Sequence, residues 1–268
     1  MSKVNYLNLG CGHHFHDDWT NVDFLSTGPN VIQHNLLKGI PFEDNTFEVV
    51  YHSHVLEHFS RVDAVDFIKE CYRVLQPNGI LRIAIPDLEQ ITDNYKRLFN
   101  EGLDNLESDK IAADYEWMML EMYDQTVRNQ SGGQILDYLR QPTLPNPKFV
   151  EKRIGIEGRD IREKYLNDEK TLKKEKFRKK IEKVARMIFG KHFDYYRIGR
   201  LRLHGEIHQW MYDRYSLARL LKRCGFEEIT PQTADSSAIP NWKSYGLEYT
   251  DGIVRKPDSL FMEARKTR

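Results

Sequence analysis

Two glycines and an aspartate near the start of the chain have the types and the spacing to hold a nucleoside. Gly10 and Gly12 directly follow the apolar run Tyr6–Leu9. Asp23 follows a second, shorter apolar run. Glycine lets the backbone approach a ligand closely, and a carboxylate at the end of a second strand can accept hydrogen bonds from both ribose hydroxyls. A phosphate cradle is disfavoured, because His13 and the residues after it stand where the nucleotide fingerprint needs a third glycine.

Histidines form the second group of residues suited to chemistry, since the pKa of imidazole lies close to working pH. His54 and His58 lie four residues apart around Glu57, so on a helix they share one face. His204 and His208 repeat this spacing. Each could be a general base, or could cap or pack at a helix start. The spacing also suits metal ligands, but the HExxH order is absent, so we expect no metal.

The elements that must position these residues alternate between strand and helix. Apolar runs predict strands at 6–9, 31–37, 47–51 and 80–87, and helical spacing predicts a helix at 65–75. Such alternation predicts a parallel sheet covered on both faces. Ligands of these sheets sit beyond the carboxyl ends of the strands. Five strand ends should converge there, carrying Gly10, Asp23, Asn35, His52 to His54, and Asp87.

Several motifs then occur in the order of a known family. They are LNLGCG, NVD, HNLLKGIPFEDNTFEVVYHSHVLEHF and ECYRVLQPNGILRIAIPD, over residues 5–90, with further matching pieces at 208–213, 216–226 and 257–264. This order resembles the S-adenosylmethionine-dependent methyltransferases of the Rossmann-like class (class I), near the methyltransferase type 11 group. The resemblance implies an α/β fold with a seven-stranded, mostly parallel sheet, an antiparallel last strand, and a helical insertion after the fifth strand.

The resemblance also assigns residues to the cofactor S-adenosylmethionine. Gly10 and Gly12 would face its methionine part, and Asp23 would hold the ribose. Asn35 and Leu36 would flank the adenine. Where the family usually has Asp, this chain has Asn35, which offers an amide in place of a charge. The other residues expected at the cofactor are Asn8, Cys11 and Ser53.

The residues after the fourth predicted strand restrict the reaction. Enzymes that methylate exocyclic amines of nucleic-acid bases resemble one another in an Asn or Asp, two prolines and an aromatic there, but this chain has His52-Ser53-His54. A covalent thiol mechanism is disfavoured by the positions of the cysteines, Cys11, Cys71 and Cys224. We therefore expect methyl transfer to an oxygen or an unactivated nitrogen, with a positioned base.

The resemblance favours three histidines as that base: His54, His58 and His208. Glu57 would orient it. Asp87 is a further possible base or substrate ligand, or else an N-cap for a helix that starts near Leu88.

Between residues 88 and 203 the alternation stops and the chain becomes helical, polar and locally charged. We expect residues 1–87 to form the cofactor-binding half, 88–203 a helical insertion or lid, and 204–268 the last helix and closing strands. The segment Tyr115–Tyr123 is typical of a core between insertion helices. The segment Lys170–Arg186 is basic with an apolar stripe, which suits either a packed surface helix or peripheral contact with an anionic membrane.

Aromatic residues of the C-terminal part are candidates for holding the acceptor. They are Trp210, Tyr212, Trp242 and Tyr245. Aromatic faces beside hydrogen-bonding groups hold sugars, but the same residues could build a small core under a long loop. Related sequences of this C-terminal type resemble methyltransferases of surface-polysaccharide and glycan assembly, which favours a sugar hydroxyl as the acceptor.

The composition excludes other classes. The 268 residues include 40 Lys and Arg against 40 Asp and Glu, so no net charge attracts nucleic acid. Three cysteines form no disulfide framework. The N-terminus shows no apolar signal segment, and no apolar run is long enough to cross a bilayer. We expect a cytoplasmic enzyme, peripheral at the membrane if the basic segment binds there.

Three functions follow from this reading. The favoured one is O-methylation of a saccharide, a glycan intermediate or a related small acceptor. A second is methylation of a lipid-like or secondary-metabolite acceptor, which requires an apolar pocket built from Trp117, Met118, Leu120 and Met122. The third is a non-catalytic scaffold that binds the cofactor without turnover.

Overall fold

The computed structural model describes residues 4–203 and 205–267. The chain divides into two compact units. Residues 1–89 and 209–268 form the first, here named the sheet unit, and residues 90–208 form the second, the helical unit. The insertion expected from the sequence spans residues 88–203.

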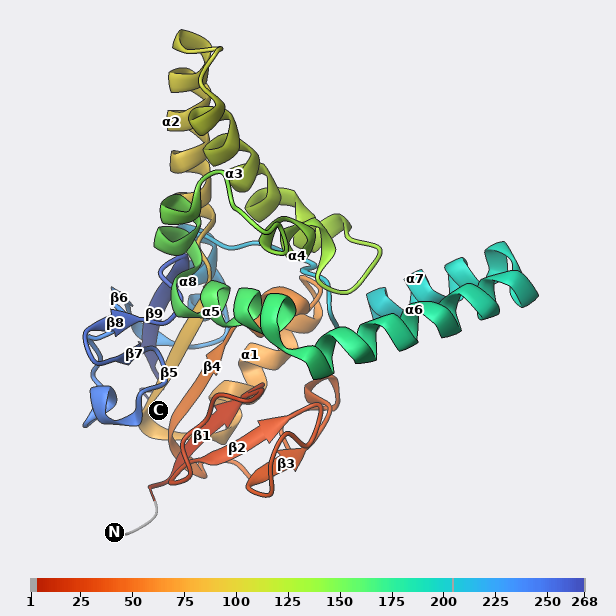
Figure 1. Cartoon of the computed structure of the whole chain (residues 1–268). Helices are drawn as coiled ribbons and strands as arrows, with labels where there is room; N and C mark the ends of the chain where they lie inside the picture. Colours follow the sequence, from red (N-terminus) through yellow and green to blue (C-terminus); the bar gives the residue numbers. More distant parts are fainter. Residues whose placement is uncertain (1–3, 204, 268) are drawn as a thin grey trace. The chain divides into compact units, whose positions relative to one another are not determined.

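The sheet unit is built on seven strands in the order β3-β2-β1-β4-β5-β9-β6 (Figure 1). Strands β1 to β5 pair in parallel, whereas β9 runs antiparallel between β5 and β6. The fold class predicted from the sequence, a Rossmann-like methyltransferase fold with an antiparallel last strand, is confirmed. The strands are β1 (Tyr6–Leu9), β2 (Thr20–Asp23), β3 (Val31–Gln33), β4 (Phe47–Ser53), β5 (Leu75–Pro86), β6 (Glu227–Gln232) and β9 (Ser259–Arg265).

Two helices cover one face of this sheet, α1 (Asp63–Val74) and α8 (Arg214–Arg223). The buried residues of α1 recur at the three- and four-residue spacing of an amphipathic helix. Asp213 and Ser216 form a capping box that starts α8. The two helices and this face of the sheet enclose the larger hydrophobic core, here named the main core. Its helix residues include Phe67, Ile68, Leu217 and Leu221.

The opposite face carries a second core that a loop covers. This second core contains Tyr6, Trp19, Val49, Tyr51, Ile80, Ile239, Trp242 and Leu247. The covering loop includes the short 3-10 helix η3 (Trp242–Tyr245). It is tied to the sheet by Arg82, whose guanidinium pairs with Glu263 at 2.7 Å and donates to the carbonyl of Ser236. The loop leads to a small separate hairpin, β7 (Tyr249–Thr250) and β8 (Ile253–Val254).

The run 31–37, expected as one strand, divides in two. Strand β3 ends at Gln33, and the 3-10 helix η1 (Leu36–Lys38) follows. Asn35 causes the change, because its Oδ1 accepts the N–H of Leu37 at 3.0 Å and so caps the turn.

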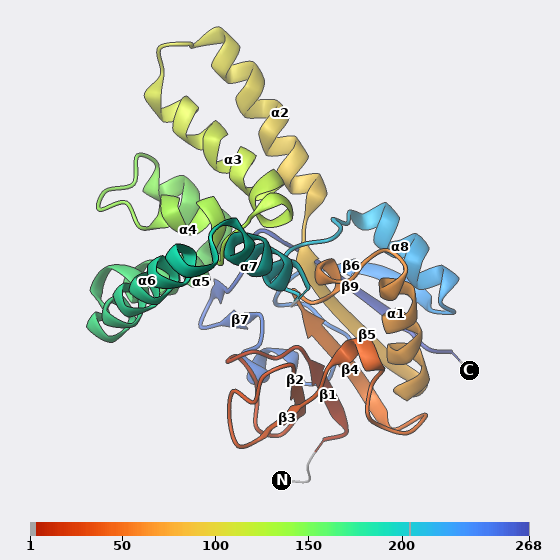
Figure 2. The same cartoon turned by 90° about the vertical axis from the view of Figure 1, so that its right-hand side faces the viewer.

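The helical unit contains the insertion predicted after the fifth strand. Figure 2 shows α2 running beside α3, and Figure 1 shows α6 running beside α7. Trp117 and Met118 on α3 are fully buried, as expected for a core between insertion helices. Its helices are α2 (Leu88–Asp104), α3 (Asp109–Val127), α4 (Gly133–Leu139), α5 (Pro147–Asn167), α6 (Glu169–Phe189) and α7 (Lys191–Leu203), with α2 beginning at the end of the sheet unit.

Over residues 4–203 and 205–267, no helix is both long enough and apolar enough to cross a membrane.

Candidate active site

The turn after β1 is shaped by its two glycines for different reasons. Gly10 has φ 64° and Gly12 has φ 55°, in the left-handed region that favours glycine. A Cβ on Gly10 would lie 2.3 Å from Cγ2 of Val55, so the backbone passes too close to the end of β4 for any side chain. A Cβ on Gly12 would meet no heavy atom within 4 Å. The space beside Gly12 is therefore open to a ligand.

Asp23, the last residue of β2, holds this turn in place. Its Oδ2 accepts the N–H of Gly12 at 2.8 Å, and its Oδ1 accepts the N–H of Leu25 at 2.9 Å. The two oxygens of a carboxylate offer about four lone-pair positions. Two of them are used here. The half-buried Asp23 can therefore accept further hydrogen bonds from a pair of hydroxyls beside the glycine turn.

The other predicted cofactor residues have structural contacts as well. Asn8 is buried under the turn, where its amide donates to Oδ1 of Asn21 at 3.2 Å and joins β1 to β2. Asn35 caps η1 through its Oδ1, so its Nδ2 is the group it can direct at a base. Leu36 packs on the main core beside it. Their roles toward the cofactor stay predictions.

Cys11, between the two glycines, is a thiol and not a nucleophile. Burial, together with the negative charge of Asp23, raises the pKa of Cys11 to about 12. Only a thiolate attacks carbon efficiently, so this residue supports no covalent mechanism at neutral pH. This agrees with the expectation from the cysteine positions.

Ser53 ends β4 and belongs to a buried network that the sequence analysis missed. Tyr51 donates a short hydrogen bond to Glu248, and Ser53 contacts both side chains. Burial raises the pKa of the Glu248 carboxyl and also that of the Tyr51 hydroxyl. Glu248 lies nearly two hundred positions away in the sequence, so no local pattern marks it as a partner of β4.

The first predicted histidine, His54, is held by two partners. Its Nδ1 lies 3.2 Å from Oε1 of Glu57, and its Nε2 lies 2.8 Å from Oγ of Ser259 on β9. His54 has φ 53°, and this left-handed conformation bends the backbone between β4 and the 3-10 helix η2 (Leu56–His58). His54 and His58 therefore do not share a helical face, contrary to the expectation from their spacing.

The other predicted histidines lie in different parts of the chain. His58 ends η2 and is half-buried. His208 belongs to the helical unit, where its backbone N–H donates to the carbonyl of Gln125 at 3.0 Å. His204 lies outside the described residues. Their catalytic roles, and the orienting role of Glu57, stay predictions.

The segment before α8 is fastened to the ends of β4 and β5. The N–H of Gln209 donates to the carbonyl of Glu57 at 2.8 Å, and its Nε2 donates to that of His58. Tyr212 forms an isolated parallel bridge with Asp87, and its carbonyl accepts the N–H of Leu88. Residues from the two ends of the sequence thereby meet at the carboxyl edge of the sheet.

The five predicted acceptor residues divide between this edge and the second core. Trp210 is 40% exposed, and Tyr212 lies beside it. Asp87 acts as an N-cap, since its Oδ1 accepts the N–H of Glu89 at 3.0 Å. By contrast, Trp242 is 4% exposed, and the ring of Tyr245 packs 5.2 Å from that of Trp19.

The geometry fits S-adenosylmethionine. Gly12 with its open side, Asp23 with its spare acceptor capacity and Asn35 with its amide lie after successive strands β1, β2 and β3, and the resemblance predicts that they hold the methionine part, the ribose and the adenine. When bound, this cofactor supplies an electrophilic methyl group on a sulfonium centre. The residues of the chain would bind and orient it.

Comparison with known proteins agrees with this interpretation. A curated protein of Mycolicibacterium smegmatis, described as a probable S-adenosylmethionine-dependent methyltransferase, is 33% identical over 73 residues, which are 27% of this chain and 28% of that protein. The chain thus aligns with well under two thirds of that relative's length.

Two solved structures with weak similarity to this chain are described as methyltransferases. A SAM-dependent methyltransferase from Archaeoglobus fulgidus aligns over 98% of this chain and 86% of that one, at 12% identity and a TM-score of 0.39. One from Thermotoga maritima aligns over 98% and 82%, also at 12% identity, with the same TM-score of 0.39.

The family model described as a methyltransferase domain matches residues 7–83. These residues run from β1 into β5 and include both glycines, Asp23 and the end of β4. From β1 into β5 the chain is thus similar to a methyltransferase domain, and its curated relative over a similar length is described as S-adenosylmethionine-dependent.

Proposed function

We propose that this protein transfers the methyl group of S-adenosylmethionine to an oxygen atom of a small acceptor. The observation that carries the proposal is the pairing of Asp23 with the open glycine turn at Gly12. In this reaction the acceptor oxygen forms a bond to the methyl carbon as the bond from sulfur to that carbon breaks. The hydroxyl proton must go to a base on the protein.

The proposal is tested by calorimetric titration with S-adenosylhomocysteine. Asp23→Asn keeps the shape of the side chain and one acceptor oxygen for the turn, but removes the charge that attracts the ribose hydroxyls. We expect the parent to bind and the variant to bind at least about tenfold more weakly, since a hydrogen bond to a charged group contributes about 1.5–3 kcal/mol.

Asp18→Asn is the matched control, because Asp18 is exposed and lies on the loop between β1 and β2. Its affinity should equal that of the parent. If the parent does not bind S-adenosylhomocysteine, both the enzyme and the cofactor-binding scaffold are excluded.

For the base we favour His58, with His208 as the second candidate. The third candidate, His54, contacts Glu57 and Ser259 through its two ring nitrogens. We expect His58→Gln to lower kcat by about 10²–10⁴-fold, the usual contribution of general base catalysis, and to leave the affinity for S-adenosylhomocysteine unchanged. Cofactor binding without turnover in the parent would support the scaffold hypothesis instead.

The acceptor class is the finer part of the proposal. The saccharide hypothesis now depends on Trp210 and Tyr212, because Trp242 and Tyr245 pack within the sheet unit. The lipid-like alternative has less support. It requires Trp117 and Met118 to line a pocket, but both are fully buried in the helical unit. A screen of sugar acceptors against apolar phenols, read as transfer of labelled methyl, separates the two.

A peripheral membrane contact is the remaining part of the proposal. On α6 the apolar stripe is exposed, including Phe177 at 66% and Ile188 at 67%, and lysines and arginines flank it. A basic amphipathic helix of this kind suits an anionic lipid surface. Ile181→Glu with Ile188→Glu should abolish co-sedimentation with phosphatidylglycerol vesicles, whereas Leu106→Glu, in an exposed loop, should not. Equal binding to neutral vesicles would contradict the proposal.

A further inference from the structure

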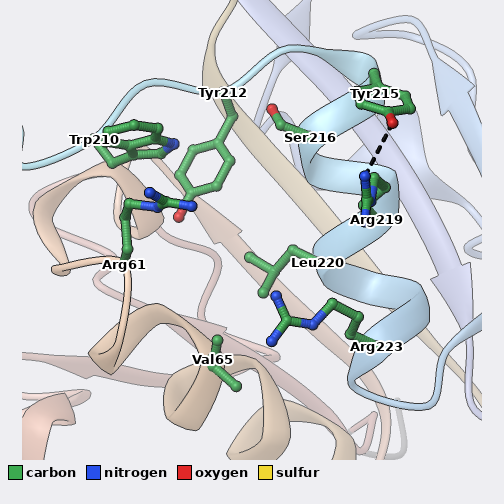
Figure 3. Close-up of a pocket in the computed structure, with 9 residues that line it drawn as sticks. All are labelled: Arg61, Val65, Trp210, Tyr212, Tyr215, Ser216, Arg219, Leu220 and Arg223. Carbon is green, nitrogen blue, oxygen red and sulfur yellow. Dashed lines mark hydrogen bonds between the residues drawn. The ribbon is translucent and has the colours of Figure 1, made fainter.

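A cavity of about 330 Å³ lies in the sheet unit between α8 and the residues that lead into α1. Figure 3 shows Arg61, Trp210 and Tyr212 on one side of it, and Arg219 and Arg223 on α8 at the other. The volume lies in the range of small-molecule sites. None of the residues lining the cavity is acidic. Its electrostatic character is therefore positive.

Three arginines line this cavity. Among the described residues, Arg61, Arg219 and Arg223 form no ion pair with Asp or Glu. Their neighbour Arg214, which does not line the cavity, pairs with Glu89 at 2.5 Å. Like charges around one cavity repel one another, and no carboxylate of the described residues forms an ion pair with these three guanidinium groups. An anionic ligand would compensate their charge.

Aromatic rings hold two of these guanidinium groups in place. The Arg61 guanidinium lies 4.6 Å from the centre of the Trp210 ring. Arg219 lies 5.6 Å from the ring of Tyr215 and donates to its hydroxyl at 3.0 Å, as Figure 3 shows. A ring contact orients a guanidinium without neutralising its charge. Most of the N–H donors of both groups remain for a ligand.

The phenol of Tyr212 adds a neutral donor between these charges. The side chain is 5% exposed, and its hydroxyl points toward Arg61 in Figure 3. Burial, with the negative charge of Glu57, raises the pKa of Tyr212 to about 12. The hydroxyl is therefore protonated at neutral pH and can donate to an anion.

We infer that this cavity binds a phosphate group carried by the acceptor of the methyl transfer. Planar guanidinium forks match the oxygens of a phosphate, and a doubly charged group suits three arginines better than a single carboxylate does. The exposed face of Trp210 can contact the apolar side of the attached molecule.

The position of the cavity agrees with this assignment, which rests on the proposed function. Tyr212 pairs with Asp87 directly after β5, and Arg61 follows η2, which itself follows β4. The cavity therefore begins at the carboxyl ends of β4 and β5. In sheets of this type ligands bind at that edge, so a phosphate held here would direct the rest of the acceptor toward it.

Calorimetric titrations with three probes test the inference: glucose 1-phosphate, glucose, and dihexanoyl phosphatidic acid. We expect a phosphate probe to bind the parent with a Kd below about 1 mM, and glucose not to bind. The double variant Arg61→Gln with Arg219→Gln should bind it about a hundredfold more weakly, about tenfold for each charge-assisted contact. Arg214→Gln, on the same helix but paired with Glu89, is the matched control and should bind as the parent does.

The outcomes separate this inference from the proposed function. Binding of glucose 1-phosphate indicates a free sugar phosphate, and binding of the phosphatidic acid alone indicates a lipid phosphate; both support the phosphate site. No binding of either phosphate at about 10 mM, or equal binding by parent and double variant, overturns it. The double variant should still bind S-adenosylhomocysteine as the parent does. If the parent binds phosphate but not S-adenosylhomocysteine, only the proposed function fails.

Discussion

Two tryptophans of the C-terminal part each face an arginine, yet their surroundings are opposite. The ring of Trp242 lies 4.2 Å from the guanidinium of Arg82, and the ring of Trp210 lies 4.6 Å from that of Arg61. Trp242 is 4% exposed and donates its indole N–H to the carbonyl of Ala234, whereas Trp210 is 40% exposed. One pair closes a core and the other borders a cavity.

The partner of each arginine accounts for this difference. Arg82 is fully buried, pairs with Glu263 at 2.7 Å and donates to the carbonyl of Thr233 at 2.8 Å. A charge satisfied in this way can be enclosed with an aromatic ring. Arg61 lines the cavity without an acidic partner among the described residues, so its charge must face water or a ligand. The comparison therefore assigns a structural role to one pair and a binding role to the other.

The largest expected difference in stability is between variants that replace Arg82 and Arg61. Arg82→Met should lower the free energy of unfolding by about 4–5 kcal/mol, because Glu263 keeps a buried charge without its partner. Arg61→Met should change it by less than about 1 kcal/mol, since the side chain is exposed. Urea denaturation followed by tryptophan fluorescence measures both values. Equal losses in the two variants would remove the distinction between the pairs.

A smaller difference is expected from the tryptophans themselves. Trp242→Ala leaves a large cavity in the second core and should lower the free energy of unfolding by about 3–4 kcal/mol. Trp210→Ala should cost less than about 1 kcal/mol, and should instead weaken binding of glucose 1-phosphate. Thermal unfolding of the two variants gives the loss of stability, and calorimetric titration of the same preparations gives the affinity for glucose 1-phosphate. A destabilised Trp210→Ala variant that still binds the phosphate as the parent does would reverse the assignment.

The order of elements in the sheet unit could be predicted because its signals are local. The strand at 47–51 and the helix at 65–75 both appear within a few residues of the expected bounds. Apolar periodicity, Gly and Pro stops, and alternation between strands and helices are properties of short windows. The parallel α/β sheet follows from them, whereas the seven strands and the antiparallel last strand were implied by the family resemblance.

The backbone at the end of β4 could not be predicted in the same way. The spacing of His54 and His58 suggests a helix, but His54 has φ 53° and only a short 3-10 helix follows. A single left-handed residue that is not glycine has no strong sequence signal. The contact of His54 Nδ1 with Oε1 of Glu57 is a consequence of that bend.

The two tryptophans show the same limit at longer range. Both lie in segments rich in aromatic and polar residues, so composition predicts the same role for both. Trp242 is covered because Arg82 on β5 reaches it from far away in the sequence. Side-chain contacts of this separation depend on the folded sheet, and they decide which aromatic faces remain accessible.

The two faces of β4 also differ in how their buried titratable groups are hydrogen-bonded. On the second-core face, Tyr51 and Glu248 satisfy each other through a hydrogen bond. On the α1 face, His52 is fully buried against Phe67, and neither of its ring nitrogens has a hydrogen-bond partner among the described residues. Burial lowers the pKa of His52 from 6.5 to about 4, although the charge of Glu57 opposes the shift.

This buried histidine predicts a loss of stability in acid. A group whose pKa is lower in the folded protein favours the folded state above its unfolded pKa, and this contribution falls as the pH drops from 6.5 toward about 4. Between about pH 7.5 and about pH 5 the loss should be about 2 kcal/mol. His52→Leu removes the titrating group at similar volume, so its unfolding free energy should decline by about 2 kcal/mol less over that range.

His13→Leu, at an exposed position, should follow the parent at every pH. Urea denaturation of the three proteins across this range tests the prediction, because carboxylates that also titrate there contribute equally to all of them. If parent and His52→Leu decline in parallel, His52 takes up its proton while folded. Its ring nitrogens would then have to find partners as the pH falls, and the α1 face of β4 would be as well satisfied as the face that holds Tyr51 and Glu248.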